Sequence, residues 1–153
     1  SPSRNIPIAV TNMKKTRVLF VCTGNSARSQ MAEAFLRKYA DDRFEVYSAG
    51  LEPARGVNPF TVRVMEELGY DMSGHYAKDV RQYVGRMHFG YVITVCDRAE
   101  QSCPIFPGIT QRLHWSLEDP AAFEGDEPAK LAKFREVRDQ VEAHVKAWIK
   151  GDH

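Results

Sequence analysis

The sequence has no long hydrophobic run and almost no net charge, and these two absences exclude several classes of protein. No apolar stretch approaches the roughly 20 residues that a membrane-spanning helix needs, and the formal net charge is +1. A nearly neutral chain gives no reason to expect nucleic acid or an anionic membrane as a partner. The start of the chain lacks the apolar core of a secretory signal. We therefore interpret residues 1–15 as a flexible N-terminal extension and expect a cytoplasmic protein.

Cysteine is also scarce. The chain has three cysteines, an odd number that argues against a framework of structural disulfides. Six residues separate Cys96 from Cys103, which fits neither a zinc site with only these ligands nor the two-residue spacing of a thioredoxin-type dithiol. We expect no bound metal or organic cofactor. The plain alternative for each thiol is a buried, unreactive side chain.

What is present is a regular alternation of strand-like and helix-like segments in a chain of 153 residues. Buried strands show as continuous β-branched and aromatic runs, and helices as apolar residues spaced by three or four. Such alternation with short connections predicts a single α/β domain over residues 16–150, with a parallel sheet covered by helices on both faces. The predicted strands are residues 16–21, 44–50, 90–96 and 111–115, and the predicted helices are residues 29–40, 60–70, 78–84 and 127–150.

Two of the cysteines fall where an open parallel sheet binds its ligands. Cys22 and Cys96 each stand at the carboxyl end of a buried strand. All residues between Cys22 and Arg28 are short, so their backbone N–H groups can converge on a tetrahedral anion. The following helix dipole adds positive potential that favours the Cys22 thiolate, Arg28 can bind two oxygens of the anion, and Ser29 can donate to the sulfur. The alternative is a strand-end cysteine near a surface arginine. The short residues are Thr23, Gly24, Asn25, Ser26 and Ala27.

The stretch VCTGNSARSQMAEAF closely resembles the oxyanion loop and first helix of the low-molecular-weight protein tyrosine phosphatase superfamily. Within it, CTGNSxRSQMAE is most similar to the thioredoxin-coupled arsenate reductases. The resemblance extends over about residues 16–150 and includes VYSAG, VITVC and HWSLEDPA. It implies a flavodoxin-like, three-layer fold whose four parallel strands lie in the order 2-1-3-4. The strands that carry Cys22 and Cys96 would then be neighbours.

An oxygen that leaves arsenate or phosphate needs a proton from a general acid. Asp119 stands before Pro120 in LEDPAAF, and proline biases the aspartate toward an extended backbone. From the residues alone, a turn or helix-cap aspartate is an equal alternative. The resemblance implies that Asp119 is the general acid, with Glu118 as the second candidate.

If the segment between Cys96 and Cys103 is helical, the two residues lie about 10.5 Å apart along its axis. Disulfides usually join Cα atoms about 4.4–6.8 Å apart, so a bond between this pair would require the segment to unwind. Without the resemblance, a core thiol and an incidental loop thiol would be the better interpretation. The resemblance implies a relay instead. Cys22 attacks arsenate, Cys96 then forms a disulfide with Cys22 as arsenite leaves, Cys103 takes over the bond to Cys96, and thioredoxin or a similar dithiol reduces it.

Two other functions remain as alternatives. A phosphatase for phosphotyrosine would need neither Cys96 nor Cys103. Phosphatases of this superfamily usually have an aromatic residue directly after the aspartate-proline pair, whereas here two alanines follow and Phe123 is the nearest aromatic. A non-catalytic dithiol redox sensor would have no use for Arg28 and Asp119.

Two departures from the family pattern stand out. Ala27 replaces a further cysteine of many members, which the relay does not need. Some related reductases also hold potassium beside the loop, and their ligand positions correspond here to Asn25, Glu33, Ser48, Tyr76 and Lys78. Because an ammonium stands where a carboxylate would be, we expect no potassium. We expect Lys78 to reach Glu33 and Asn25 with its own charge, the alternative being a solvent-facing lysine. The histidines, His75 and His114 among them, are interpreted as structural or surface residues.

Overall fold

The computed structural model describes residues 15–108 and 110–151, so residues 1–14 of the expected extension lie outside the described residues. In the described part, four strands form one parallel sheet in the order β2-β1-β3-β4. The α/β fold and the strand order expected from the sequence are therefore confirmed. The strands are β1 (Thr16–Cys22), β2 (Phe44–Gly50), β3 (Tyr91–Thr94) and β4 (Gln111–His114).

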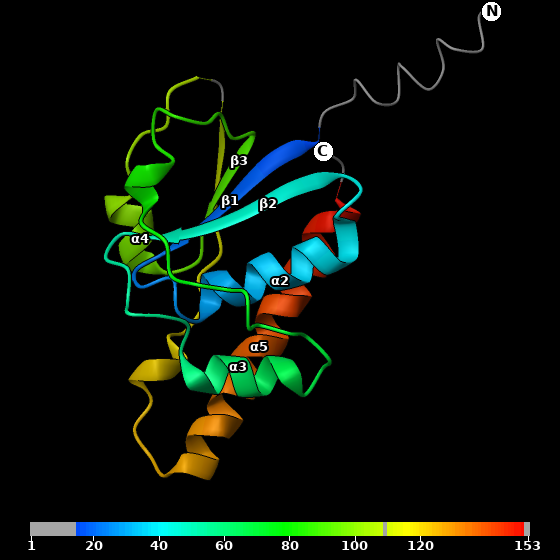
Figure 1. Ribbon diagram of the computed structural model, residues 1–153, viewed down its shortest axis with the longest axis vertical. Coiled ribbons are helices and arrows are strands. Elements are labelled where there is room, and N and C mark those ends of the chain that lie inside the picture. The colour runs from blue at the N-terminus through cyan, green and yellow to red at the C-terminus, as the bar shows by residue number, and fades with distance from the viewer. Residues whose placement is uncertain (1–14, 109, 152–153) are drawn as a thin grey trace, which may run out of the picture.

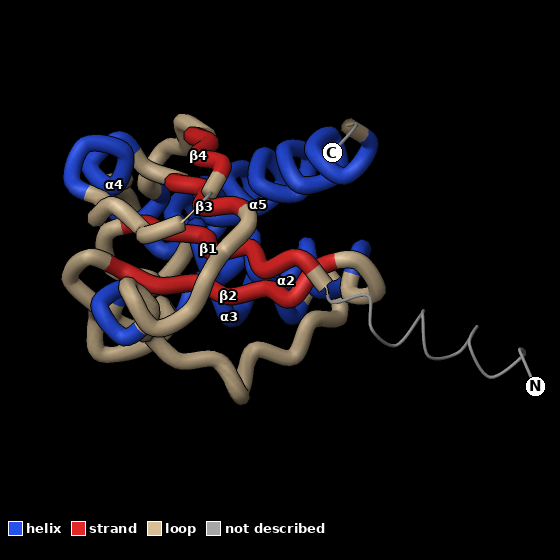
Figure 2. Tube along the Cα trace, turned by 90° about the horizontal axis from the view of Figure 1, so that it is seen from above, coloured by secondary structure: helices blue, strands red, loops and turns tan. Residues whose placement is uncertain are grey.

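The longer helices gather on one side of the sheet. Helix α2 (Arg28–Ala40) contacts β1, β2 and α5 (Glu127–Lys150), and α3 (Pro59–Glu66) contacts α5. Figure 1 shows the strand arrows ending on the side where the short helix α4 (Asp97–Ser102) lies, with α2, α3 and α5 grouped below them. Figure 2 shows the strands side by side and α4 apart from the other helices. None of the described helices is both long and apolar enough to cross a bilayer.

Capping residues fix the first turns of two helices. The side chain of Asn58 accepts a hydrogen bond from the first turn of α3, and Pro59 is the first helical residue. Asp126 caps α5 in the same way. The predicted strand over residues 44–50 and the predicted helix over residues 127–150 match the structure at both ends.

Two predicted helices are wrong in extent. The helix expected over residues 60–70 ends at Glu66, and the chain then turns through Gly69 at φ +87°, a conformation that glycine adopts freely. The stretch over residues 78–84 is helical only in the 3₁₀ turn η2 (Val80–Gln82), because Asp79 caps that turn and pairs in a bridge with Gly50. A second turn, η3 (Pro120–Ala122), follows Asp119.

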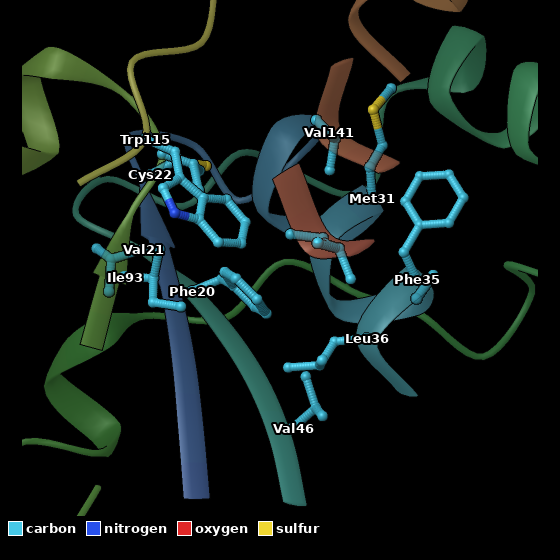
Figure 3. Packing of buried hydrophobic residues seen from close by; sticks show 14 of the residues in the cluster. Phe20, Val21, Cys22, Met31, Phe35, Leu36, Val46, Ile93, Trp115 and Val141 are labelled. Carbon is cyan, nitrogen blue, oxygen red and sulfur yellow. The ribbon is translucent and has the colours of Figure 1, made fainter. Parts of the chain in front are cut away.

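The core lies between the sheet and helices α2 and α5. Phe20 on β1 packs against Trp115, with ring centroids 5.6 Å apart, and Figure 3 shows this pair beside Met31 of α2 and Val141 of α5. Residues 18–21 of β1 are all 0% exposed, as their uninterrupted apolar sequence predicted. A strand buried on both faces cannot slide in register, so its last residue, Cys22, is held at a fixed point on the sheet edge.

Candidate active site

The loop between Cys22 and Arg28 turns its N–H groups inward because its carbonyls are bonded on the outside. The carbonyls of Cys22, Thr23, Gly24 and Ser26 accept hydrogen bonds of 2.8–3.0 Å from N–H groups of the segment 51–58. Each peptide N–H points opposite to its own carbonyl, so this pattern leaves the N–H groups facing the loop centre. The backbone of the loop is therefore arranged so that its N–H groups could converge on an anion, and anion binding itself stays a prediction.

Close approach of β2 to this loop requires Gly50. A Cβ atom on Gly50 would lie 2.7 Å from the carbonyl oxygen of Thr23 and 2.9 Å from the backbone nitrogen of Asn25. Backbone atoms cannot move aside as a flexible side chain can. Glycine at the end of β2 thus lets strand and loop pack directly against each other.

The sulfur of Cys22 lies on the floor of the loop and is almost fully buried, with 2% of the residue exposed. Its Sγ is 2.9 Å from the Ser29 hydroxyl and accepts a hydrogen bond of 3.2 Å from the N–H of Asn25. Asn25 has φ +53°, a left-handed conformation that asparagine tolerates better than most residues. The predicted contact between Ser29 and the sulfur is present.

Asn25 connects the sulfur to a buried carboxylate through two hydroxyls. Its amide nitrogen can only donate, and it donates to Ser29 Oγ at 2.7 Å and to Ser48 Oγ at 3.0 Å. The Ser48 hydroxyl in turn donates to Glu33, and the Ser29 proton is free to point at Cys22. This directed chain leaves the Ser29 hydroxyl able to donate to the Cys22 sulfur.

Lys78 and Arg37 neutralise the buried Glu33 carboxylate. Lys78 Nζ is 3.6 Å from Glu33 Oε1, and Arg37 lies 2.9 Å from Oε2. The Lys78 side chain is 8% exposed, so the solvent-facing alternative is wrong. Burial lowers the pKa of Lys78, and the Glu33 charge opposes that shift. Lys78 also contacts Asn25, but not through its ammonium as expected. Its backbone N–H donates to Asn25 Oδ1 at 2.8 Å.

Gln30 is a residue of this site that the sequence analysis missed. Its side chain is fully buried, and Nε2 donates to the backbone O and to Oδ1 of Asn25, both at 3.1 Å, and to the Tyr76 carbonyl at 2.9 Å. Gln30 Oε1 lies 2.9 Å from His75 Nδ1. The sequence did contain a signal for Gln30, because a polar amide stands there among the apolar residues on the buried side of α2.

Arg28 and Asp119 meet at the mouth of the loop. Arg28 donates to the Leu117 carbonyl at 2.9 Å, which fixes the guanidinium, and its other nitrogen lies 3.8 Å from Asp119 Oδ2. Asp119 Oδ1 accepts from the N–H of Ala121, so this residue also caps η3, as the alternative interpretation expected. Its Oδ2 is the oxygen that faces Arg28. Glu118, the second candidate acid, is instead paired with Lys133 at 3.2 Å.

The other two thiols are positioned by α4. Cys96 caps the start of this helix, where Sγ accepts from the N–H of Ala99 at 3.4 Å, and the hydroxyl of Thr23 lies 3.4 Å from the same sulfur. Cys103 forms the other end, and its N–H donates to the Ala99 carbonyl at 2.9 Å. Cys103 is half-buried, and burial raises the pKa of its thiol. The supposed helix between the two thiols is thus present.

Among the described residues no cluster of histidine, cysteine or acidic side chains could hold a metal ion. The expectation that no metal or cofactor is bound stays a prediction.

The sequence and the fold were compared with those of known proteins. A family described as low molecular weight phosphotyrosine protein phosphatase matches residues 17–151. An arsenate reductase of Halalkalibacterium halodurans is 43% identical over 136 residues, 89% of this chain and 96% of the relative. A solved arsenate reductase in the phosphate binding state has a TM-score of 0.70 at 34% identity, covering 88% of this chain and 96% of that chain. A thioredoxin-dependent arsenate reductase of Corynebacterium glutamicum has a TM-score of 0.67 at 28% identity, covering 97% of this chain and 69% of that chain.

Proposed function

This chain belongs to the arsenate reductases of the low molecular weight phosphotyrosine protein phosphatase superfamily, and from this membership we propose that it reduces arsenate to arsenite through Cys22, Cys96 and Cys103. In the net reaction, two thiols give up two electrons and two protons, and arsenate becomes arsenite and water. The observation that carries the proposal is the placement of the thiols. One lies in the oxyanion loop, the second lies 3.4 Å from a loop hydroxyl, and the third ends the helix that the second begins.

In the first step the loop N–H groups and Arg28 bind arsenate, and the Cys22 thiolate attacks arsenic. One arsenate oxygen leaves as water with a proton from Asp119. Asp119 is placed for this role because Oδ1 is engaged by Ala121, and Oδ2 lies 3.8 Å from Arg28, the residue proposed to bind the oxyanion that receives the proton. Ser29 holds the thiolate through the chain from Asn25.

In the second step the Cys96 thiolate attacks the Cys22 sulfur. The sulfur–arsenic electron pair stays on arsenic, so arsenite leaves and a disulfide joins Cys22 and Cys96. Neighbouring strands β1 and β3 bring both residues to one sheet edge, since Val21 is opposite Thr94 in the register. The Thr23 hydroxyl can donate to the Cys96 thiolate from 3.4 Å.

In the third step Cys103 attacks Cys96 and releases the Cys22 thiolate. The two ends of α4 lie too far apart for this bond while the helix is intact. Unwinding therefore accompanies the transfer and moves the new disulfide outward. A dithiol of the thioredoxin class then reduces it, a proposal supported by the thioredoxin-dependent relative.

Phosphatase activity is the second candidate, because the loop would bind phosphate by the same contacts. The geometry around Phe123 argues against phosphotyrosine as the main substrate. Lys133 lies over its ring at 5.4 Å, and Gly125 packs so closely that an added Cβ would come within 3.0 Å of the ring. We expect weak hydrolysis of aryl phosphates through Cys22. A redox sensor without turnover would leave Arg28 and Asp119 unexplained.

The relay is tested by comparing three serine substitutions in two assays. Cys22→Ser should abolish both thioredoxin-coupled arsenite formation and hydrolysis of p-nitrophenyl phosphate, because both begin with its thiolate. Cys96→Ser and Cys103→Ser should abolish only multiple-turnover reduction. Normal coupled turnover by either of these variants, with unchanged phosphatase activity, would contradict the relay.

A further inference from the structure

Helix α4, which must unwind in the proposed relay, has little apolar packing to hold it. Ala99 is its one buried residue, and the other five residues are exposed. A six-residue helix with a single buried methyl group is not stable by itself. Its stability must come from contacts that its exposed side chains make with the rest of the protein.

His114, the last residue of β4, makes such contacts with the first turn of α4. Its Nε2 is 3.0 Å from Asp97 Oδ1, and its Nδ1 is 2.8 Å from the Thr94 hydroxyl and 3.7 Å from Glu100 Oε2. A carboxylate only accepts hydrogen bonds, so Nε2 carries the hydrogen and donates to Asp97. One imidazole ring thus ties β4, β3 and α4 together.

Two hydroxyls support the same contacts. Ser116 donates to Asp97 Oδ1 at 3.2 Å. The Thr94 hydroxyl lies 3.2 Å from Glu100 Oε2 and 2.8 Å from His114 Nδ1, and its single proton can serve either of these acceptors. The hydrogen bonds from His114 and Ser116 hold the pKa of Asp97 below its usual range, so the carboxylate is charged at neutral pH. Asp97 and Glu100 are three residues apart and therefore project from one face of the helix.

We propose that His114 is a positioning residue for the relay, and that its bond to Asp97 keeps α4 wound until Cys96 has reacted with Cys22. The inference rests on the relay proposed above. Asp97 directly follows Cys96 in the chain, so the contact restrains the residue next to the thiol that must change partners. When the contact breaks, the first turn opens and Cys103 can reach Cys96.

Loss of this contact has a specific cost for the enzyme. Cys96 and Cys103 would pair before arsenate is processed, and the oxidised chain could not resolve the next Cys22–arsenic adduct. With hydrogen peroxide as oxidant, the two thiols give two hydrogens to the peroxide, which becomes two waters, and one disulfide forms.

The test measures this pairing without arsenate. In Cys22→Ser protein, hydrogen peroxide drives formation of the Cys96–Cys103 disulfide, which mass spectrometry follows over time. Adding His114→Ala should accelerate it by about tenfold, the effect of losing one hydrogen bond to a charged group. His114→Gln keeps an Nε2–H donor and should stay within about twofold of the parent. In an Asp97→Ala background, His114→Ala should add far less than tenfold, because the shared contact is already gone.

Each outcome decides between the positioning role of His114 and a purely structural one. Equal disulfide rates in the parent and the His114→Ala protein would overturn the positioning role, as would full additivity with Asp97→Ala. Hydrolysis of p-nitrophenyl phosphate by His114→Ala with Cys22 present should equal that of the wild type and reports whether the variant folds. If it does not fold, Asp97→Ala breaks the same bond from the exposed side, and an unchanged rate there overturns the positioning role. Failure of the relay itself would show separately, as arsenate turnover by Cys96→Ser or Cys103→Ser.

Discussion

Replacing Gly50 with alanine should damage the oxyanion loop more than any other single-methyl addition near it. The new Cβ would lie 2.7 Å from the Thr23 carbonyl oxygen and 2.9 Å from the Asn25 nitrogen. Ordinary van der Waals contact begins at 3.4 Å, so the backbone must shift by about 0.7 Å to restore it. Overpacking against atoms that cannot rotate away costs about 1–3 kcal/mol.

The same shift moves the groups proposed to bind the anion. Asn25 carries the N–H that contacts Cys22 and the amide that orients Ser29. Misplacement by up to an ångström can lower a rate by about 10²-fold, so we expect p-nitrophenyl phosphate hydrolysis and single-turnover arsenate reduction to fall by about 10- to 100-fold. The melting temperature should fall by about 2–12 °C, since a domain of this size loses about 2–4 °C per kcal/mol.

Gly56→Ala is the matched control. A Cβ at Gly56 meets nothing within 4 Å, and an alanine there reduces the freedom of the unfolded chain. We expect wild-type activity and unchanged or slightly raised stability. If Gly50→Ala behaves like Gly56→Ala in both calorimetry and kinetics, close packing of β2 against the loop does not position the site.

Further predictions concern the acid, the last thiol and the buried lysine. Asp119→Asn should slow the first chemical step by about 10²–10⁴-fold with oxyanion binding largely retained; a wild-type single-turnover rate would show that another group is the acid. Burial raises the pKa of Cys103, and its attack needs the thiolate, so transfer of the disulfide to Cys96–Cys103 should accelerate as pH rises between about pH 7 and pH 9; a flat quenched-flow profile would contradict this. Wild-type activity should not change when potassium replaces sodium at fixed ionic strength, whereas Lys78→Asp with Tyr76→Thr should become potassium-dependent; potassium activation of the wild type would refute the role given to Lys78.

Local patterns in the sequence were sufficient for most of the fold and for the position of the cysteine loop on the sheet. A continuous apolar run forces β1 to be buried on both faces, and this run by itself predicts that Cys22 lies at a sheet edge. Short residues up to Arg28 predicted the curled loop after β1, because they leave the backbone free to turn. The helix over residues 127–150 followed from its apolar spacing and its cap. Each of these features depends on residues close together in the chain.

Contacts between distant segments were decided only by the tertiary structure. His114 and Asp97 are 17 residues apart, and Lys78 and Asn25 are 53 apart. Neither pair has a sequence period that reveals it, because parallel strands bring such residues together only once the whole sheet has formed. The same holds for Gly50. Glycine is required at the end of β2 because the backbone of the loop after β1 would collide with any side chain there. The sequence thus determined which groups can react, and the packing of strands and helices decided which neighbours hold them in place.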